Sequence, residues 1–250
     1  MANEDERGEP AASALRIAGE AVLWSANERD RAGRPLLVLM HGYGSHEGDL
    51  FGLSPYLPLG PAIASVRAPI AEAGGHAWFP RGGEPAVNPP GNPRAEIADA
   101  AVAAMLTWLD GVAPAGSGGA EPGGSGQVGS SAGGTGPAPR VGLLGFSQGG
   151  AMALQLMRHA PGRFACAVNL SGFVVEGAAE GDDELARRHP PVFWGRGTDD
   201  EVIPHDAIAR TDAWLPKHAD LDARIYEGLG HAVSPQELTD VAAFLRVHLG

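Results

Sequence analysis

The chain has 250 residues, and its hydrophobic content of 44% is enough for the core of one α/β domain of ordinary size. Its 30 acidic and 18 basic residues give a net charge of −12, which argues against nucleic acid or an anionic membrane as a partner, because phosphate repels such a surface. No apolar run approaches the roughly 18 residues of a transmembrane helix, so we expect no membrane insertion. The acidic, polar first residues are the opposite of a signal peptide, and we therefore expect a cytoplasmic protein.

The first half of the chain predicts a disordered tail over residues 1–12, followed mainly by strands. Two short early strands are joined by a turn near Gly19, and two fully apolar strands follow, of which the first is central. These four predicted strands cover residues 14–17, 21–24, 35–40 and 62–66. A short helix begins at Asp49. A long irregular, proline-rich stretch follows Pro69, and from Arg94 the apolar residues recur at helical spacing.

Residues 111–139 form a low-complexity segment in which Val112 and Val128 are the only large aliphatic residues and Glu121 is the only charge. So little apolar surface cannot stabilise an independent fold, and we expect a flexible insertion. The segment is not a domain boundary, because the helix before it must cover a sheet formed partly by the strands after it. The sequence therefore predicts a single domain over residues 13–250.

The second half of the chain alternates strands and helices. The predicted strands cover residues 141–144, 164–170, 191–194 and 223–226, and helices lie between them and at the end. The last helix has clear start signals: Ser234 as N-cap, Pro235 at the first helical position, and Glu237 three residues after the cap. This alternation predicts an α/β fold with a mostly parallel central sheet and helices on both faces.

A Gly-x-Ser-x-Gly motif centred on Ser147 joins the strand at 141–144 to the helix that follows it. This motif is the nucleophile elbow of α/β-hydrolases when it links a strand to a helix. Gly145 and Gly149 flank the serine because the sharp turn brings the two backbones too close for a Cβ atom. We expect Ser147 to adopt a strained positive φ that lifts its hydroxyl above the sheet. The alternative is a glycine-rich turn that merely contains a serine.

Further polar residues follow other strands, and in a parallel sheet such strand ends meet at one edge, where ligands bind. Asp199 and Asp200 come 52 and 53 residues after Ser147, and His231 comes 31 residues after Asp200. The order Ser, Asp, His is that of the α/β-hydrolase triad, in which a neutral imidazole takes the serine proton and a carboxylate orients the imidazole. Among nine histidines, His231 has the expected place, on a loop between a strand and a capped helix. His41 precedes the serine, and we expect it to order its loop.

The sequence resembles the phospholipase/carboxylesterase family of α/β-hydrolases, which includes bacterial carboxylesterases and acyl-protein thioesterases. The resemblance implies Asp200 rather than Asp199 as the acid, because the family's acid lies four residues before its proline, here Pro204. It also suggests a homodimer. The chain departs from the family in the 111–139 insertion, in Arg196, where histidine is usual, and in Pro80, where a polar residue is usual. The matching segments are 41–44 with 49–50, 78–79, 145–150, 170–173, 197–204 and 230–231.

The oxyanion hole of such an enzyme is built from two backbone N–H groups. One is expected from Gln148, the residue after the nucleophile, and the other from the loop after Met40. The resemblance implies Tyr43 as this second donor. Trp78, Phe79 and Phe173 are candidates for the wall that binds the acyl group, and the alternative for these three is ordinary packing under a long loop.

These features predict a serine hydrolase that cleaves carboxylic esters or thioesters of small to medium acyl groups through an acyl-enzyme. A lysophospholipase or peptidase with the same triad, and a catalytically silent binding protein, are the alternatives. The expected partner is a small-molecule ester or thioester. We expect no metal and no organic cofactor, because the sequence has no cysteine pair, no His-Glu-x-x-His motif and no dinucleotide-binding glycine motif. The one cysteine, Cys166, lies in a strand and is predicted to be a small core residue.

Overall fold

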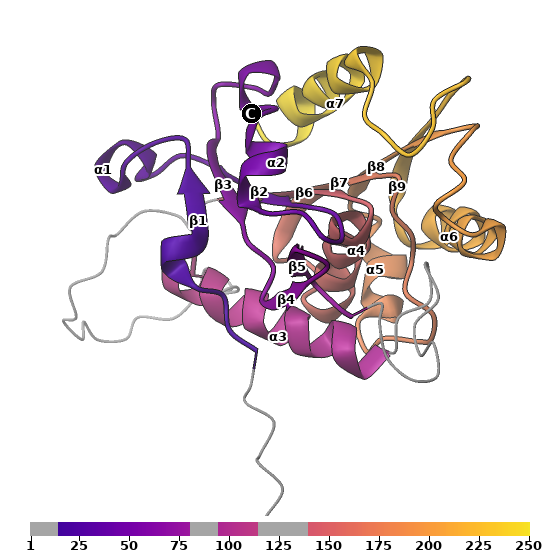
Figure 1. Ribbon diagram of the computed structural model, residues 1–250, viewed down its shortest axis with the longest axis horizontal. Helices are drawn as coiled ribbons and strands as arrows, with labels where there is room; N and C mark the ends of the chain where they lie inside the picture. Colours follow the sequence, from indigo (N-terminus) through magenta and orange to yellow (C-terminus); the bar gives the residue numbers. More distant parts are fainter. Residues whose placement is uncertain (1–14, 81–94, 115–139) are drawn as a thin grey trace, which may run out of the picture.

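The computed structural model describes residues 15–80, 95–114 and 140–250 (Figure 1). The tail predicted at residues 1–12 lies outside the described residues. So do the proline-rich part of the predicted irregular stretch and residues 115–139 of the predicted insertion.

A seven-stranded sheet forms the centre of the structure, in the order β1-β3-β2-β6-β7-β8-β9. The edge strand β1 is antiparallel to β3, and every other neighbouring pair is parallel, which confirms the mostly parallel sheet predicted from the sequence. The strands are β1 (Val22–Trp24), β2 (Leu36–Met40), β3 (Ala62–Val66), β6 (Val141–Phe146), β7 (Phe164–Leu170), β8 (Pro191–Gly197) and β9 (Asp220–Tyr226).

Helices cover both faces of this sheet (Figure 1). One face carries α3 (Ala95–Val112), α4 (Gln148–His159), α5 (Asp182–Arg188) and α6 (His205–His218), and the other carries α2 (Glu47–Phe51) and α7 (Pro235–His248). Each face has its own apolar cluster, and the side chains of β2 show why: Val38 and Met40 point into the first cluster, Leu37 and Leu39 into the second. A strand buried on both sides must be apolar at every position, which is the pattern that predicted it.

The predicted strand at residues 14–17 is wrong, since residues 15–17 have no regular structure. The physical reason is that Leu15 and Ile17 already pack against the cluster under α3, so their apolar contacts are made without a strand partner. The short helical segment η1 (Gly19–Ala21) follows this stretch. Two others, α1 (Glu28–Arg31) and η2 (Ser54–Tyr56), follow β1 and α2.

The stretch predicted as irregular after Pro69 contains a small hairpin of β4 (Ile70–Glu72) and β5 (Gly75–Ala77). Its two-residue turn is tight, with positive φ at both Ala73 and Gly74. Strands of three residues leave no periodic pattern in a sequence, and alanine at a positive φ is not a recognisable turn signal. The sequence therefore does not predict this hairpin.

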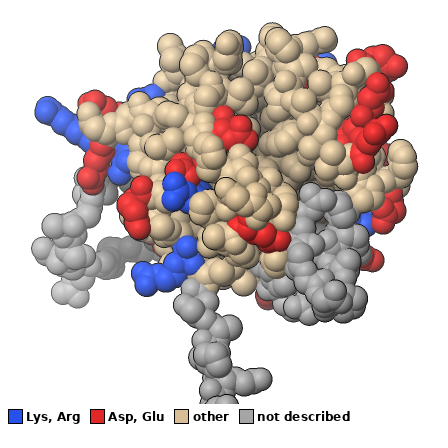
Figure 2. All heavy atoms as spheres, in the orientation of Figure 1, with Lys and Arg blue, Asp and Glu red and all other residues tan. Residues whose placement is uncertain are grey.

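Charge is unevenly distributed on the face shown in Figure 2. On the side where Figure 1 labels β9 and α6 the charged side chains visible are mostly acidic, whereas on the side of α1 and below it basic and acidic side chains are mixed. Among the helices that the structure describes, none is both long and apolar enough to cross a membrane.

Helix α7 begins with the predicted capping box, in which Ser234 Oγ accepts a hydrogen bond from the Glu237 N–H and the Glu237 side chain accepts one from the Ser234 N–H. Glu237 is fully buried beside Gly195 of β8, and its Oε1 atom has no hydrogen-bond partner. Burial raises the pKa of this carboxyl group to about 7. Below about pH 7, the folded protein therefore favours the protonated form.

This raised pKa predicts a pH-dependent difference in stability between the wild type and Glu237→Gln. Below pH 4.5 both the folded and unfolded states hold the proton, but between pH 4.5 and about 7 only the folded state does. Relative to the variant, the wild type should lose about 1.4 kcal/mol of unfolding free energy per pH unit in this window, and no more above it. Urea unfolding of both proteins from pH 4 to 8 measures this difference; a difference that is constant with pH would contradict the prediction.

Candidate active site

The turn between β6 and α4 has the geometry of a nucleophile elbow. Ser147 has φ +56° and ψ −117°, the strained conformation that the sequence predicted. A Cβ atom on Gly145 would lie 2.0 Å from the Gly149 carbonyl oxygen, and one on Gly149 would lie 1.8 Å from the Met40 carbonyl oxygen. Both positions therefore require glycine, and the serine is held at the carboxyl edge of the sheet between β2 and β7.

Asp200 and His231 form a hydrogen-bonded pair at the same edge. His231 Nδ1 lies 2.8 Å from Asp200 Oδ2, and the other carboxylate oxygen accepts hydrogen bonds from the N–H groups of Val202 and Ile203. Asp200 is 7% exposed, whereas its neighbour Asp199 is exposed and accepts a hydrogen bond from Thr198 instead. A carboxylate that accepts from Nδ1–H leaves Nε2 with its lone pair, which is the tautomer that a general base needs.

The imidazole of His231 lies beside the residue that precedes the serine. Its ring centroid is 4.8 Å from that of Phe146, at an angle of 45°. Among the hydrogen bonds of the described residues, none joins Ser147 to His231. The structure thus contains the carboxylate–imidazole pair of the predicted triad, and the contact between the imidazole and the Ser147 hydroxyl stays a prediction.

The loop after β2 is held by the hairpin of β4 and β5. The Gly44 N–H donates to the His76 carbonyl at 2.9 Å, and the His76 N–H donates to the Ser45 carbonyl at 2.8 Å. The Tyr43 hydroxyl donates to Glu72 of the same hairpin at 2.9 Å. The hairpin that the sequence did not predict is thus the element that shapes the loop containing Tyr43.

His41 orders this loop from inside, as the sequence predicted. Its Nδ1 lies 2.7 Å from the Gly42 carbonyl, and its Nε2 lies 3.1 Å from the Ala68 nitrogen, which fits a neutral ring that donates at one nitrogen and accepts at the other. Burial lowers the pKa of His41, and this favours the same neutral state.

The three aromatic residues predicted as candidates for the acyl wall are buried: Trp78, Phe79 and Phe173 are 0%, 3% and 2% exposed. They belong to the cluster under the sheet, where Phe79 and Phe173 meet edge to face with ring centroids 6.5 Å apart. These contacts are those of the packing alternative, and contact with a substrate stays a prediction.

The described residues contain no group of three or more His, Cys, Asp or Glu side chains that could hold a metal ion. Cys166 is buried in β7, and burial raises the pKa of its thiol to about 12, which is the state of an inert core cysteine. His159 of α4 lies 2.9 Å from Asp99 of α3, because these two helices pack side by side.

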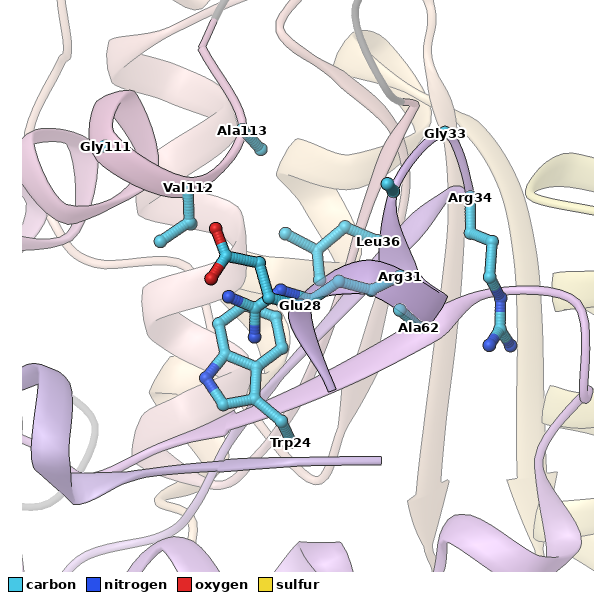
Figure 3. Close-up of a pocket in the computed structure, with 11 residues that line it drawn as sticks. Trp24, Glu28, Arg31, Gly33, Arg34, Leu36, Ala62, Gly111, Val112 and Ala113 are labelled. Carbon is cyan, nitrogen blue, oxygen red and sulfur yellow. The ribbon is translucent and has the colours of Figure 1, made fainter. Parts of the chain in front are cut away.

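A hollow of about 270 Å³ lies at the opposite edge of the sheet, where β2 and β3 begin (Figure 3). It is bounded by α1 and by the end of α3, and the guanidinium of Arg31 lies 3.7 Å from the ring centroid of Trp24 at its side. Ser147, Asp200 and His231 follow the carboxyl ends of their strands, so this hollow is not part of their site.

Comparison with known proteins agrees with this arrangement. Residues 130–249, which include β6 and all elements after it, match the family described as Phospholipase/Carboxylesterase. The match contains the serine elbow and the loops of Asp200 and His231, and it confirms the family resemblance seen in the sequence.

The relatives and structural neighbours extend this result. Acyl-protein thioesterase 1 of Eremothecium gossypii is 34% identical over 116 residues, which are 45% of this chain and 49% of the relative. The chain thus matches about half the length of that relative. The carboxylesterase structures of Mesorhizobium loti and Bacillus cereus are 19% and 18% identical, with TM-scores of 0.66 and 0.68. The aligned residues make up 94% and 91% of this chain, and 99% and 93% of the two carboxylesterase chains. This likeness confirms the α/β-hydrolase fold.

The geometry predicts that Asp200→Asn slows reaction at Ser147 and that Asp199→Asn does not. An amide at residue 200 would favour the wrong imidazole tautomer, which in a serine triad costs about 10⁴-fold in rate. The rate at which a fluorophosphonate labels Ser147 measures this effect. Equal labelling rates for the two variants would show that the carboxylate of residue 200 does not orient the base.

Proposed function

We propose that the protein is a serine hydrolase that cleaves carboxylic esters or thioesters through an acyl-enzyme. The observation that carries the proposal is the hydrogen bond between buried Asp200 and His231 at the edge of the sheet where the strained elbow presents Ser147. The buried carboxylate is paired with the imidazole, and the serine with positive φ follows another strand end at the same edge of the sheet. This arrangement supports nucleophilic catalysis.

In the acylation step, Ser147 Oγ attacks the carbonyl carbon of the substrate while His231 Nε2 takes the hydroxyl proton. Asp200 keeps Nδ1–H oriented and stabilises the imidazolium that forms. The negative charge on the carbonyl oxygen is held by the backbone N–H groups of Gln148 and Tyr43. Gln148 is the first residue of α4, where amide groups have no acceptor within the helix.

The tetrahedral intermediate then collapses. The bond to the alcohol or thiol breaks, and His231 returns the proton to this leaving group. A water molecule next attacks the acyl carbon, with His231 as the base, and the acid is released from Ser147. The serine regains its proton, so the enzyme is restored without a metal ion or an organic cofactor.

The substrate class rests on the relatives. A thioesterase of acylated proteins and two carboxylesterases share the family or the fold, and all three names describe hydrolysis at an acyl carbonyl. We therefore place a carboxylic ester or thioester of a small to medium acyl group at Ser147. A lysophospholipase or a peptidase would use the same three residues and differs in the leaving group.

Hydrolysis of p-nitrophenyl esters of graded chain length by the wild type and by Ser147→Ala tests this proposal. The wild type should turn over short or medium esters, and the variant should lose the activity by at least about 10³-fold, because the nucleophile is gone. The fluorophosphonate should label the wild type and leave the variant unlabelled.

Two other outcomes are informative. A wild type that neither hydrolyses esters nor takes the label would identify a silent hydrolase fold that only binds. Labelling at Ser147 together with cleavage of lysophospholipids or peptides, but not of simple esters or thioesters, would favour the lysophospholipase or peptidase alternative.

A further inference from the structure

Trp78 joins two segments that are far apart in the sequence. Its backbone N–H donates to Gln148 Oε1 at 3.1 Å, and its indole Nε1–H donates to the His41 carbonyl at 2.8 Å. Gln148 completes the first connection, because its Nε2 donates to the Phe79 carbonyl at 2.7 Å. One buried tryptophan therefore holds the start of α4 on one side and the end of β2 on the other.

These two segments are the ones that supply the proposed oxyanion donors. Gln148 provides one backbone N–H, and Tyr43 lies two residues after His41. Gly42, between them, lies against the nucleophile: a Cβ atom on Gly42 would be 3.5 Å from Ser147 Cβ. Any shift of the His41 carbonyl therefore moves the Tyr43 backbone relative to Ser147 and to the Gln148 N–H.

The environment of these bonds makes them strong. Trp78 and His41 are fully buried, and Gln148 is nearly so. Losing a buried donor leaves its acceptor without water and costs more than losing an exposed one. The ring nitrogens of His41 also have partners, at Ala68 and Gly42, so its carbonyl is fixed through Trp78 and its ring through neighbouring backbone.

Packing alone does not require such a bond. Trp194 is buried to a similar degree in the same cluster, and its Nε1 has no hydrogen-bond partner among the described residues. A tryptophan can thus fill this core without using its N–H group. The indole N–H group of Trp78, in contrast, donates to the His41 carbonyl.

We propose that Trp78 is a positioning residue that sets the spacing of the two oxyanion donors. This inference rests on the proposed function and gives Trp78 a role other than that of an acyl wall. Because such donors must lie within about 2.7–3.1 Å of the oxygen that becomes charged, small displacements reduce the rate of the chemical step more than they reduce substrate binding.

Trp78→Phe tests the inference, with Trp194→Phe as the matched control. Both variants remove an indole from the same cluster and leave a similar cavity, but only the first breaks a hydrogen bond. We expect kcat for a p-nitrophenyl ester to fall about 10- to 100-fold in Trp78→Phe, with KM within about twofold of the wild type. Trp194→Phe should leave both constants within about twofold of the wild type. Equal kcat values in the two variants would overturn the inference.

An alkyl boronic acid separates positioning from general loosening of the fold. Its tetrahedral adduct with Ser147 places an oxygen in the oxyanion hole, so its inhibition constant should rise by the same factor as kcat falls. An unchanged inhibition constant would contradict the inference. Thermal unfolding of both variants shows whether they are folded.

Gln148→Met gives a second route, which does not depend on the folding of Trp78→Phe. It removes both side-chain bonds to residues 78 and 79 and keeps the backbone N–H. We expect it to lower kcat as well, and the double variant with Trp78→Phe to lose less than the product of the two single losses, because both changes break one connection. Multiplicative losses, or no loss in Gln148→Met, would count against the inference. These outcomes are distinct from failure of the proposed function, in which the wild type itself is inactive and unlabelled.

Discussion

The whole site depends on the close approach of the first turn of α4 to the end of β2. With the Gly149 backbone against the Met40 carbonyl, there is no room for a Cβ atom, and the chain enters α4 through a serine with positive φ. The rest of the sheet offsets the cost of this strain, because its central strands are packed on both faces and hold the turn in place. The elbow thus places the hydroxyl of Ser147 and the backbone N–H of Gln148 next to each other at the edge of the sheet.

Around this contact, buried polar groups hold the neighbouring loops through hydrogen bonds. Asp200 receives two backbone N–H groups on one oxygen and His231 on the other, so a carboxylate 7% exposed is fully paired. His41 is neutral and ties its own loop together. Direct contact between His231 Nε2 and Ser147 Oγ is the connection that the proposed mechanism still requires, because the proton passes between these two atoms.

The parts that could be predicted from the sequence are those with local signals. The central strands show as continuous apolar runs, the start of α7 as a capping box, and the elbow as a motif between a strand and a helix. The parts that could not be predicted have no local signal. Leu15 and Ile17 alternate like a strand but pack as irregular chain, and the hairpin of β4 and β5 has three-residue strands and an alanine in its turn. Its pairing with residues 44 and 45 is decided by contacts distant in sequence.

The sequence by itself determined the fold class, the elbow and the order of Ser147, Asp200 and His231, because strand ends of a parallel sheet meet at one edge whatever the details of packing. The choice of Asp200 over Asp199 came from the family resemblance, and the tertiary structure showed that the Asp200 side chain is the one that contacts His231. The tertiary structure alone showed that Trp78 lies inside the core with its N–H groups directed at Gln148 and His41. Both results depend on side-chain directions and burial, which arise only when distant segments pack together.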